Sequence, residues 1–381
     1  MWKTPLQGQR SKTKAIVDNT GRFYRAENQA GGTHLALRWN GRVRFTVPRD
    51  DAAQTACWKT FRPGWLEFPL RAKARLPRLS GALSCVETDQ LASIREAAGR
   101  EAGQSCCRTG TAGVWSKDTI LFLKKRTAEP LYIVKAGAGE AVGRLLQNEA
   151  NWLRTLGDQT ALADHIPQLV AHSFAADLCL VAERALAGKL DFRFGEPHIL
   201  FLRKLQEHTR QAARLQESRF YRNIRSRLKD LDGLLSEAWS ARLDRAMRRI
   251  EQKLSDSPLL LTAAHNDFTP WNIRVEGVVA RVFDWEYADD GQLPLIDPLH
   301  FVLMPMALKR RPTCRMAKEM QKTLQHCQQL LGKESCYEAQ TQALAYLTNL
   351  CTFYLWSDRG ASESHPVLDS YAEIIDHLCR L

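Results

Sequence analysis

Long apolar segments are absent from this sequence, and so are the cysteine patterns of a zinc site. No run approaches the roughly 18 to 20 apolar residues that a membrane-spanning helix needs. The ten cysteines include no CxxC pair and no Cys/His spacing typical of a metal centre. No repeat period or low-complexity block occurs either. These absences argue against a helical membrane protein, a zinc-binding domain and a repeat protein.

The amino terminus also lacks a feature of exported proteins. The stretch MWKTPLQGQRSKTK is basic, but no apolar segment follows it, so it does not match a secretory signal. We therefore expect a cytoplasmic protein. In that compartment the cysteines are expected to be reduced thiols, most of them buried as small apolar groups.

The composition is that of a globular protein with an uneven charge. The 381 residues are 44% hydrophobic and 25% charged, and this length suits two or three structural units. The net charge is +12. Residues 1–100 hold 18 Lys plus Arg against 8 Asp plus Glu, whereas residues 101–381 hold 36 against 34. Such a basic region can attract nucleic acid, anionic lipid or a phosphorylated substrate, or it can simply be a solvated face.

Several elements can be predicted from local patterns. Residues 35–47 form two extended runs joined by Asn40-Gly41, which favours a hairpin with a tight turn. The Arg-rich tract at 197–254 has helical spacing, and its Arg residues are interpreted as a solvated face. The other expected elements are an irregular segment at 58–79, a helix at 87–103, a small sheet within 108–137, a helix at 141–156, and helices across 300–381.

The stretch AAHNDFTPWNIRVEGVVARVFDWEYAD, residues 263–289, is the most informative. Pro270 disfavours a helix, so Asp267 and Asn272 are expected on an ordered loop. The following residues read as a strand, a Glu-Gly turn and a second strand. Asn272 then enters this hairpin and Asp284 leaves it, so we expect the two side chains to meet at one end.

An amide oxygen and a carboxylate placed together suit Mg²⁺, which prefers hard oxygen ligands and keeps phosphate oxygens and water in its other positions. Asp267 is nearby and could accept a proton from an attacking hydroxyl. This division of roles is typical of kinase-type phosphoryl transfer. Isolated Asp and Asn residues beside a proline can instead be turn formers, but turn chemistry does not explain the return of the hairpin.

These residues resemble the aminoglycoside phosphotransferase and choline kinase group of small-molecule kinases, relatives of the protein kinases. The group's motif, H-G-D-x-x-x-x-N followed by D-x-D/E, is similar to HNDFTPWN at 265–272 and DWE at 284–286. The resemblance implies that Asp267 is the catalytic base and that Asn272 and Asp284 hold Mg²⁺.

The same resemblance assigns roles to neighbouring residues. Glu286 would assist a second metal or its waters, and His265 would brace the loop through hydrogen bonds. Asn266 stands where the family usually has Gly, and Asn tolerates a positive φ better than other residues. Asp297 precedes a proline and is predicted to cap a helix, or by the resemblance to support the catalytic loop. Glu286 could alternatively be a solvated carboxylate.

Further matches occur upstream, in the order that the family shows, and they imply ATP as the nucleotide. Lys135 in LYIVK resembles the strand lysine that grips the phosphates, and Glu149 resembles its helical partner. Gly110 and Gly113 lie in RTGTAG, at the position of the phosphate-covering loop. Glu183 lies in LVAERA, at the position of the hinge that meets adenine.

Simpler interpretations of these upstream residues are open. Lys135 could be an ordinary edge-strand lysine. Glu149 could be a helix-surface charge. Gly110 and Gly113 could serve only a hairpin turn.

The sequence thus predicts an α+β, bilobal protein-kinase-like fold with a basic amino-terminal extension at 1–100, a small β-rich lobe at 101–182 and a larger helical lobe at 183–381. The predicted activity is ATP- and Mg²⁺-dependent phosphorylation of a small-molecule hydroxyl, on a sugar or sugar-derived acceptor, and an anionic acceptor would suit the basic extension. One alternative is a pseudokinase that binds without turnover. Another is a binder of nucleic acid or of an anionic membrane surface through residues 1–100; no nucleic-acid fold signature supports a nucleic-acid partner.

Overall fold

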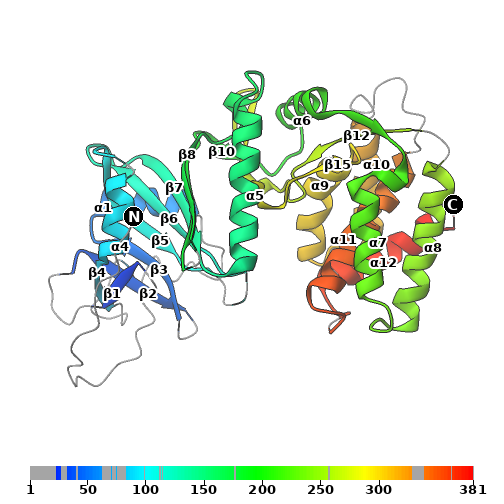
Figure 1. The fold of residues 1–381 in the computed structure, drawn as a ribbon, viewed down its shortest axis with the longest axis horizontal. Helices are drawn as coiled ribbons and strands as arrows, with labels where there is room; N and C mark the ends of the chain where they lie inside the picture. Colours follow the sequence, from blue (N-terminus) through cyan, green and yellow to red (C-terminus); the bar gives the residue numbers. More distant parts are fainter. Residues whose placement is uncertain are drawn as a thin grey trace. The chain divides into compact units, whose positions relative to one another are not determined.

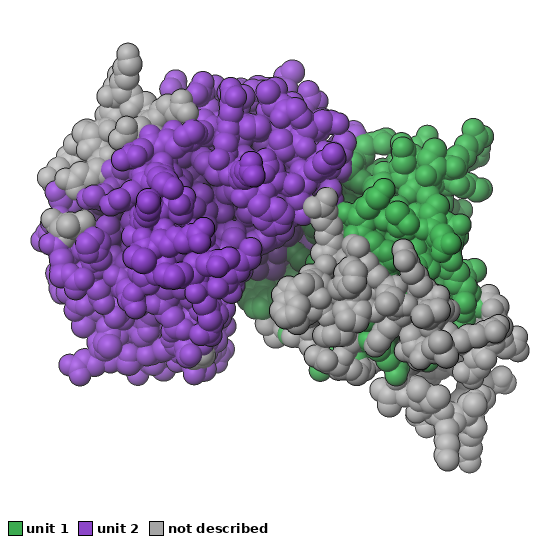
Figure 2. All heavy atoms as spheres, turned by 180° about the vertical axis from the view of Figure 1, so that it is seen from behind, with its two compact units in different colours: residues 1–142, 173–185 green, residues 143–172, 186–381 purple. Residues whose placement is uncertain are grey.

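The computed structural model describes residues 23–26, 32–39, 42–61, 70, 74, 83–97, 99–110, 113, 115–175, 177–255, 258–327, 339–361 and 363–380. The chain divides into two compact units (Figure 2). Unit 1 comprises Met1–Val142 and Ser173–Ala185, and unit 2 comprises Gly143–His172 and Leu186–Leu381. The division at 100 and 182 that the sequence suggests stays a prediction.

Unit 1 is built on one large antiparallel sheet (Figure 1). Over the described residues the strand order is β1-β4-β2-β3-β5-β6-β7-β9-β8. The strands are β1 Tyr24–Ala26, β2 His34–Trp39, β3 Arg42–Pro48, β4 Leu83–Glu87, β5 Ala102–Arg108, β6 Asp118–Lys124, β7 Pro130–Gly137, β8 Leu169–Phe174 and β9 Cys179–Arg184. The first four residues of β8 belong to unit 2. Over the residues that the structure describes here, the strands are accompanied by helices α1 Asp51–Phe61 and α4 Asp89–Ala97.

Two hairpins of this sheet confirm the sequence prediction. Strands β2 and β3 pair antiparallel, and the pairing ends with Trp39 opposite Arg42. The turn residues Asn40 and Gly41 lie outside the described residues. Strands β6 and β7 pair in the same way, with Lys135 opposite Thr119. The sheet therefore joins strands from the basic first hundred residues to strands of the predicted small lobe.

The region between these hairpins differs from the prediction in two places. The segment 58–79 was expected to be irregular, but its first residues, 58–61, belong to α1, and most of the remainder lies outside the described residues. The predicted helix at 87–103 is shorter, because Glu87 ends β4 and Ala102 begins β5.

Helix α1 covers one face of the sheet and is linked to it covalently. It packs on β3, β5 and β6, where Phe45 and Trp58 meet edge to face at 5.4 Å. Cys57 of α1 and Cys106 of β5 form a disulfide, and both are fully buried. The expectation of reduced thiols is therefore wrong for this pair, which the spacing of 49 residues did not reveal. The cysteine next to it in the chain, Cys107, is a free thiol.

Unit 2 is mainly helical, as predicted (Figure 1). Its helices are α5 Glu140–Gly157, whose first turn belongs to unit 1, and α6 Glu196–Thr209, α7 Arg219–Asp230, α8 Glu237–Leu254, α9 Ile296–Leu308, α10 Thr313–His326, α11 Ala339–Ser357 and α12 Pro366–Leu378. Its short strands are β10 Lys189–Leu190, β11 Gln211–Ala213, β12 Leu259–Ala264, β13 Ile273–Glu276, β14 Val279–Val282 and β15 Asp289–Gln292. Single 3₁₀ turns are η2 Ala163–His165, η3 Leu215–Glu217, η4 Pro270–Asn272 and η5 Trp285–Tyr287.

Two small sheets frame the predicted motif. Strand β12 pairs with β11 and β15, and β13 pairs with β10 and β14. The hairpin β13–β14 closes with Glu276 opposite Val279, and Gly277 has a φ of 60° that suits glycine. Since β12 leads into the motif and β15 follows it, both ends of the motif are fixed to one sheet.

The predicted α+β fold class, with a β-rich amino-terminal unit and a larger helical carboxy-terminal unit, is thus confirmed. Over the described residues, none of the helices combines the length and the apolar character required to traverse a lipid bilayer.

Candidate active site

The loop after β12 is held by a buried carboxylate. The Asp297 carboxylate accepts hydrogen bonds from the backbone N–H groups of His265, at 2.8 Å, and Asn266, at 3.0 Å. Asn266 has a φ of 62°, the left-handed conformation expected of an Asn in a glycine position. Burial raises the pKa of Asp297 above its usual value. The helix-cap prediction for Asp297 is wrong, because the residue lies inside α9, whereas support of the loop is what its contacts provide.

His265 braces the same loop with both ring nitrogens. Its Nδ1 accepts from the backbone N–H of Asp267 at 3.2 Å, and its Nε2 lies 2.9 Å from the carbonyl oxygen of Phe283. These two partners require a proton on Nε2 and none on Nδ1, which is the neutral ring. The ring also packs edge to face on Trp285 at 4.7 Å. His265 is fully buried, so it positions Asp267 and does not face a substrate.

Asp267 is anchored from two sides. The Asn272 amide Nδ2 donates to the Asp267 carboxylate Oδ2 at 2.8 Å and to its backbone oxygen at 3.0 Å. The other carboxylate oxygen, Oδ1, lies 3.3 Å from Nε2 of His300. His300 in turn has Nδ1 3.3 Å from the hydroxyl of Tyr346. Asp267 remains 30% exposed, so it is oriented and still accessible.

The two flanks of the hairpin meet as the sequence predicts. The backbone N–H of Phe283 donates to the carbonyl oxygen of Asn272 at 3.0 Å, which places Asp284 one residue beyond this bond. Asp284 has a φ of 72° and so turns the chain sharply after β14. Burial, followed by the negative charges of Asp267 and Asp284, raises the pKa of Tyr287 to about 12. The structure thus brings Asp267 and Asn272 into contact and pairs Asn272 with the residue before Asp284. Convergence of all three side chains on one metal ion stays a prediction.

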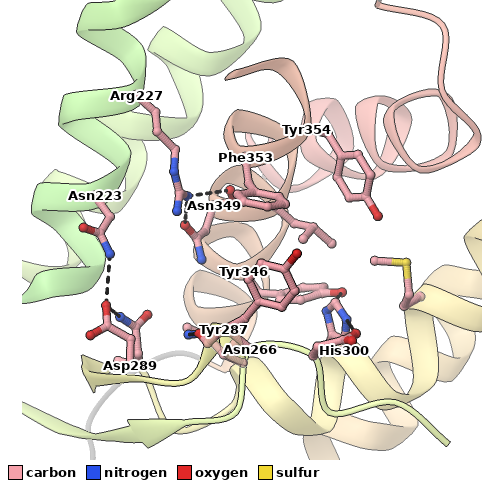
Figure 3. A pocket seen from close by; sticks show the side chains of 15 residues that line it. Asn223, Arg227, Asn266, Tyr287, Asp289, His300, Tyr346, Asn349, Phe353 and Tyr354 are labelled. Atoms are coloured by element: carbon pink, nitrogen blue, oxygen red, sulfur yellow. Dashed lines mark hydrogen bonds and ion pairs between the residues drawn. The ribbon is translucent and has the colours of Figure 1, made fainter. Parts of the chain in front are cut away.

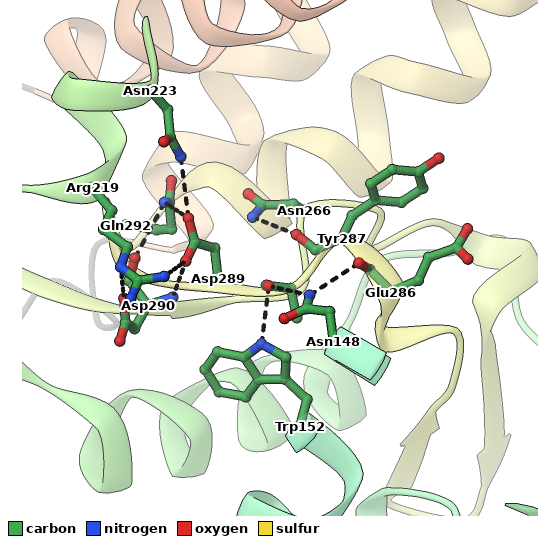
Figure 4. A network of polar contacts seen from close by, with 11 residues as sticks. Asn148, Trp152, Arg219, Asn223, Asn266, Glu286, Tyr287, Asp289, Asp290 and Gln292 are labelled. Carbon is green, nitrogen blue, oxygen red and sulfur yellow. Dashed lines mark hydrogen bonds and ion pairs between the residues drawn. The ribbon is translucent and has the colours of Figure 1, made fainter. Parts of the chain in front are cut away.

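The chain beyond Asp284 is fixed by helix α5 (Figure 4). The Asn148 amide donates to the carbonyl oxygens of Glu286, at 3.0 Å, and Ala288, at 2.9 Å, and the indole of Trp152 also donates to Ala288. Glu286 is 7% exposed, so the interpretation as a solvated carboxylate is wrong. Its role toward a metal stays a prediction.

The donor set of this loop fits a magnesium ion. Because the Asn272 Nδ2 faces Asp267, the amide oxygen faces away from it and is the group left for a cation. Within the ranges that the structure describes, no cluster of three or more His, Cys, Asp or Glu side chains could hold a metal alone. A magnesium ion here would therefore also take an amide oxygen and oxygens of its nucleotide, which is how Mg²⁺ is commonly bound.

The candidate phosphate-gripping lysine lies in unit 1. Lys135 is 5% exposed on β7, and its Nζ lies 3.9 Å from the carboxylate of Glu183 on β9. The edge-strand interpretation is wrong, since β7 lies between β6 and β9. Glu149 on α5 is fully buried, so it is not a helix-surface charge. It belongs to unit 2, and its pairing with Lys135 stays a prediction.

The glycine segment connects β5 to β6. A Cβ atom at Gly110 would collide with the backbone of Lys117, and the Gly110 N–H donates to Asp118 at 3.1 Å. Gly113 has a φ of 153°, which other residues rarely adopt. Both glycines thus serve a hairpin connection, and contact with phosphate stays a prediction.

A cavity of about 270 Å³ opens beside Asp267 (Figure 3). Helices α7, α9 and α11 and the segment from η5 to β15 supply most of its wall, and the wall is mostly aromatic, amide and hydroxyl groups. The lining residues are Asn223, Arg227, Asn266, Asp267, Tyr287, Asp289, Gln292, Ile296, His300, Met304, Tyr346, Asn349, Leu350, Phe353 and Tyr354. The sequence motif identified Asp267, but it missed the residues of α7 and α11.

Those residues carried a signal that is visible only once the helices are known. Asn223 and Arg227 are four apart on α7, and Tyr346, Asn349 and Phe353 recur at spacings of three and four on α11. The interpretation of the Arg residues at 197–254 as a solvated face is therefore wrong for Arg227.

Comparison with known proteins gives similar structures but no sequence relatives. No family model and no curated protein matches the chain. The apo form of a thermostable mutant of aminoglycoside phosphotransferase APH(4)-Ia is similar, with 14% identity over 73% of this chain and 94% of that chain and a TM-score of 0.49.

Two more solved structures belong to the same group, which is the one that the motif resembles. The streptomycin–ATP complex of APH(2'')-IIa has 15% identity over 76% and 96% of the two chains and a TM-score of 0.44. The ADP-bound form of APH(2'')-Ib has 15% identity over 72% of this chain and 93% of that chain, with a TM-score of 0.42. With each of these TM-scores below 0.5, the function of this chain has to be argued from its own residues.

Proposed function

We propose that the chain is a small-molecule kinase that transfers the γ-phosphoryl group of ATP to a hydroxyl, with Mg²⁺ as the cofactor. The observation that carries this proposal is an accessible Asp267, held by Asn272 at the base of the hairpin that leads to Asp284, beside a cavity that Asp267 lines. A structural turn would need neither an accessible, doubly anchored carboxylate nor a cavity next to it.

Each residue has a distinct part in the proposed reaction. The acceptor hydroxyl oxygen attacks the γ-phosphorus, the bond from that phosphorus to the bridging oxygen of ADP breaks, and Asp267 accepts the hydroxyl proton. Asn272 and Asp284 would hold the metal, and Glu286 would assist a second metal or its waters. When bound, Mg²⁺ neutralises charge on the phosphate oxygens. The products are a phosphate monoester and ADP.

The loop contacts explain why this arrangement can be efficient. Asp267 is oriented before a substrate arrives, since Asn272 and His300 fix its oxygens and His265 fixes its backbone. Phosphoryl transfer depends mainly on such positioning and on electrostatic stabilisation. A carboxylate that is already held loses little freedom when the acceptor binds.

Lys135, Glu149 and Glu183 are proposed for the nucleotide side, with the Gly110–Gly113 segment over the phosphates. What supports this is that Lys135 and Glu183 are buried charges on adjacent strands, which is unusual in a protein unless they serve a ligand or each other. The proposed acceptor is a sugar or sugar-derived molecule, because aromatic and amide side chains line the cavity. The proposed compartment is the cytoplasm.

The test uses the purified chain with radiolabelled ATP, Mg²⁺ and a panel of sugars, sugar acids, sugar phosphates and amino-alcohols. We expect labelled product from the wild type and a loss of roughly 100- to 10,000-fold in the Asp267→Asn variant. Nucleotide binding should persist in that variant. Full activity of Asp267→Asn would contradict the proposal, and nucleotide binding without any product would favour a pseudokinase.

A further inference from the structure

The cavity beside Asp267 contains a cationic side chain with no acidic partner of its own among the described residues. Arg227 reaches the cavity from α7 (Figure 3). Its Nη1 donates to the Asn349 side-chain oxygen at 2.8 Å, and its guanidinium lies over the Phe353 ring, 5.2 Å from the centroid. Its immediate partners in the described part of the chain are therefore an amide and an aromatic ring.

The two carboxylates of the cavity wall are already engaged. Asp289 accepts from Arg219 at 2.9 Å and from Asn223 at 3.1 Å (Figure 4). Asp267 is held by Asn272 and His300. Arg219 is not among the residues that line the cavity, so it offsets the charge of Asp289 from outside. Asp289 therefore has an ion-pair partner, Asp267 keeps the negative charge that the proposed reaction needs, and Arg227 keeps a positive charge with no ion pair among the described residues.

The position of Arg227 favours a ligand that brings a negative charge. Loss of hydration lowers the pKa of Arg227 to about 10, only partly opposed by the charge of Asp289, so the group is still a cation at neutral pH. A cation withdrawn from water without a counter-charge is destabilising. A guanidinium has five N–H donors in a fork that fits a carboxylate or phosphate. Only one of its nitrogens, Nη1, has a hydrogen bond among the described residues.

The remaining wall fits the body of a polyhydroxylated molecule. Tyr287, Phe353 and Tyr354 contribute aromatic surface to the wall, and Asn223, Asn266, Gln292 and Asn349 contribute amide groups. Burial, together with the charge of Asp267, raises the pKa of Tyr354 to about 12, so this hydroxyl stays neutral. A polycationic acceptor would place positive charge near Arg227, which is unfavourable.

We propose that the acceptor of this kinase is an anionic polyhydroxy compound, and that Arg227 binds its carboxylate or phosphate group while a hydroxyl faces Asp267. This inference rests on the proposed phosphotransferase function for the orientation of the acceptor. Arg227 is the residue that selects the anionic acceptor over its neutral counterpart.

The binding experiment compares four matched probes by calorimetry, with Mg²⁺ and ADP present so that the nucleotide phosphate site is filled. The probes are glucose, glucosamine, glucuronate and glucose 6-phosphate. We expect at least one anionic probe to bind about tenfold or more tightly than glucose, as a charge-assisted hydrogen bond allows, and glucosamine to bind most weakly. Glucuronate and glucose 6-phosphate distinguish a carboxylate ligand from a phosphate ligand.

Three variants separate recognition from folding. Arg227→Gln should remove the preference for the anionic probe, and Arg227→Lys should retain part of it because the charge remains. Arg225→Gln is the matched control, since Arg225 is exposed on the same helix and does not line the cavity. Melting temperatures of all three check that they fold. If the role of Arg227 were purely structural, Arg227→Gln would weaken the binding of all four probes equally. Arg227→Lys would then not selectively restore binding of the anionic probe.

The outcomes are decisive in both directions. Equal or tighter binding of glucose or glucosamine, no binding of either anionic probe, or a preference that survives in Arg227→Gln would overturn the inference. If the anionic probe binds through Arg227 but Mg²⁺ and ATP give no phosphorylated product, the proposed kinase activity fails and the anion site stands. If a neutral acceptor is phosphorylated as well as an anionic one, the kinase proposal stands and the inference fails.

Discussion

Asp297 illustrates how much one buried carboxylate can contribute at the scale of a single residue. It is 3% exposed and satisfies two consecutive backbone N–H groups of the loop that carries Asp267. An unsatisfied buried donor costs about 1–3 kcal/mol. The loop conformation therefore depends on a residue that is 31 or 32 positions away from those N–H groups in the chain.

We expect Asp297→Ala to lower the free energy of unfolding by roughly 2–5 kcal/mol, because two buried N–H groups lose their acceptor. Urea denaturation followed by tryptophan fluorescence measures this. Asp369→Ala is the control, since Asp369 is an exposed aspartate in the first turn of another helix. Equal stability of the two variants would contradict the support role of Asp297.

The residues of the motif could be predicted from sequence because they lie within one short stretch. A single hairpin joins Asn272 to Asp284, so local turn and strand patterns were sufficient to predict that the two ends of this hairpin pair. Arg227 and Asn349 could not be found in this way. Their contact joins two helices that are 122 residues apart, and only tertiary packing places it beside Asp267.

At the scale of elements, α6 carries a histidine that burial keeps neutral. His198 is fully buried, and its Nδ1 accepts from the Gly195 N–H at 3.3 Å. Its ring packs on Phe301 at 4.7 Å. Loss of hydration lowers the pKa of His198 from 6.5 to about 4, although Asp191 acts in the opposite direction. Among the described residues, its Nε2 has no hydrogen-bond partner.

Stability should fall as the pH decreases from about 6.5 to about 4, because the unfolded chain binds a proton at His198 before the folded chain does. The stabilisation that comes from a neutral His198 is fully present above the pKa of the unfolded chain. Its loss lowers the free energy of unfolding by about 3 kcal/mol. Denaturation curves at several pH values, for the wild type and for His198→Phe, measure it. The difference between the two proteins should change with pH over this range; a constant difference would contradict the buried, neutral state of His198.

The elements also show which local signals are dependable. The β2–β3 hairpin followed from its Asn-Gly pair, and α5 followed from its apolar spacing. The disulfide between α1 and β5 could not be predicted, because sequence spacing does not indicate which cysteines meet across a packed face. The predicted helix at 87–103 was shortened because pairing of β5 with β6 takes up the residues from Ala102 onward.

We expect the Cys57–Cys106 disulfide to stabilise unit 1. It closes a loop with a sequence separation of 49, for which restriction of the unfolded chain contributes about 2–4 kcal/mol. Thermal unfolding with and without dithiothreitol measures this, and the double variant Cys57→Ala/Cys106→Ala should be insensitive to the reductant. Equal melting temperatures of the wild type with and without dithiothreitol would contradict the prediction. Thiol titration of the unfolded protein reports directly whether the bond is present.

At the scale of the whole molecule, each unit contains residues with proposed roles. Lys135 and Glu183 belong to unit 1, whereas Asp267, Asn272 and Asp284 belong to unit 2. The excess positive charge lies in the first hundred residues, and part of that region is built into the sheet of unit 1. The fold class was implied by the resemblance of the motif to a kinase family, and periodicity indicated individual helices and strands. The cavity could not be predicted, because its wall depends on how α7, α9 and α11 pack.

The most direct test of the central claim is the magnesium dependence of nucleotide binding. Calorimetry would compare AMP-PNP binding with and without Mg²⁺ for the wild type, for Asp284→Asn and for the exposed hairpin control Glu276→Gln. We predict that Mg²⁺ tightens AMP-PNP binding in the wild type and in the control. In Asp284→Asn the gain in affinity on adding Mg²⁺ should be smaller by about 10- to 100-fold or more. Retention of the full magnesium effect in a folded Asp284→Asn protein would contradict the account.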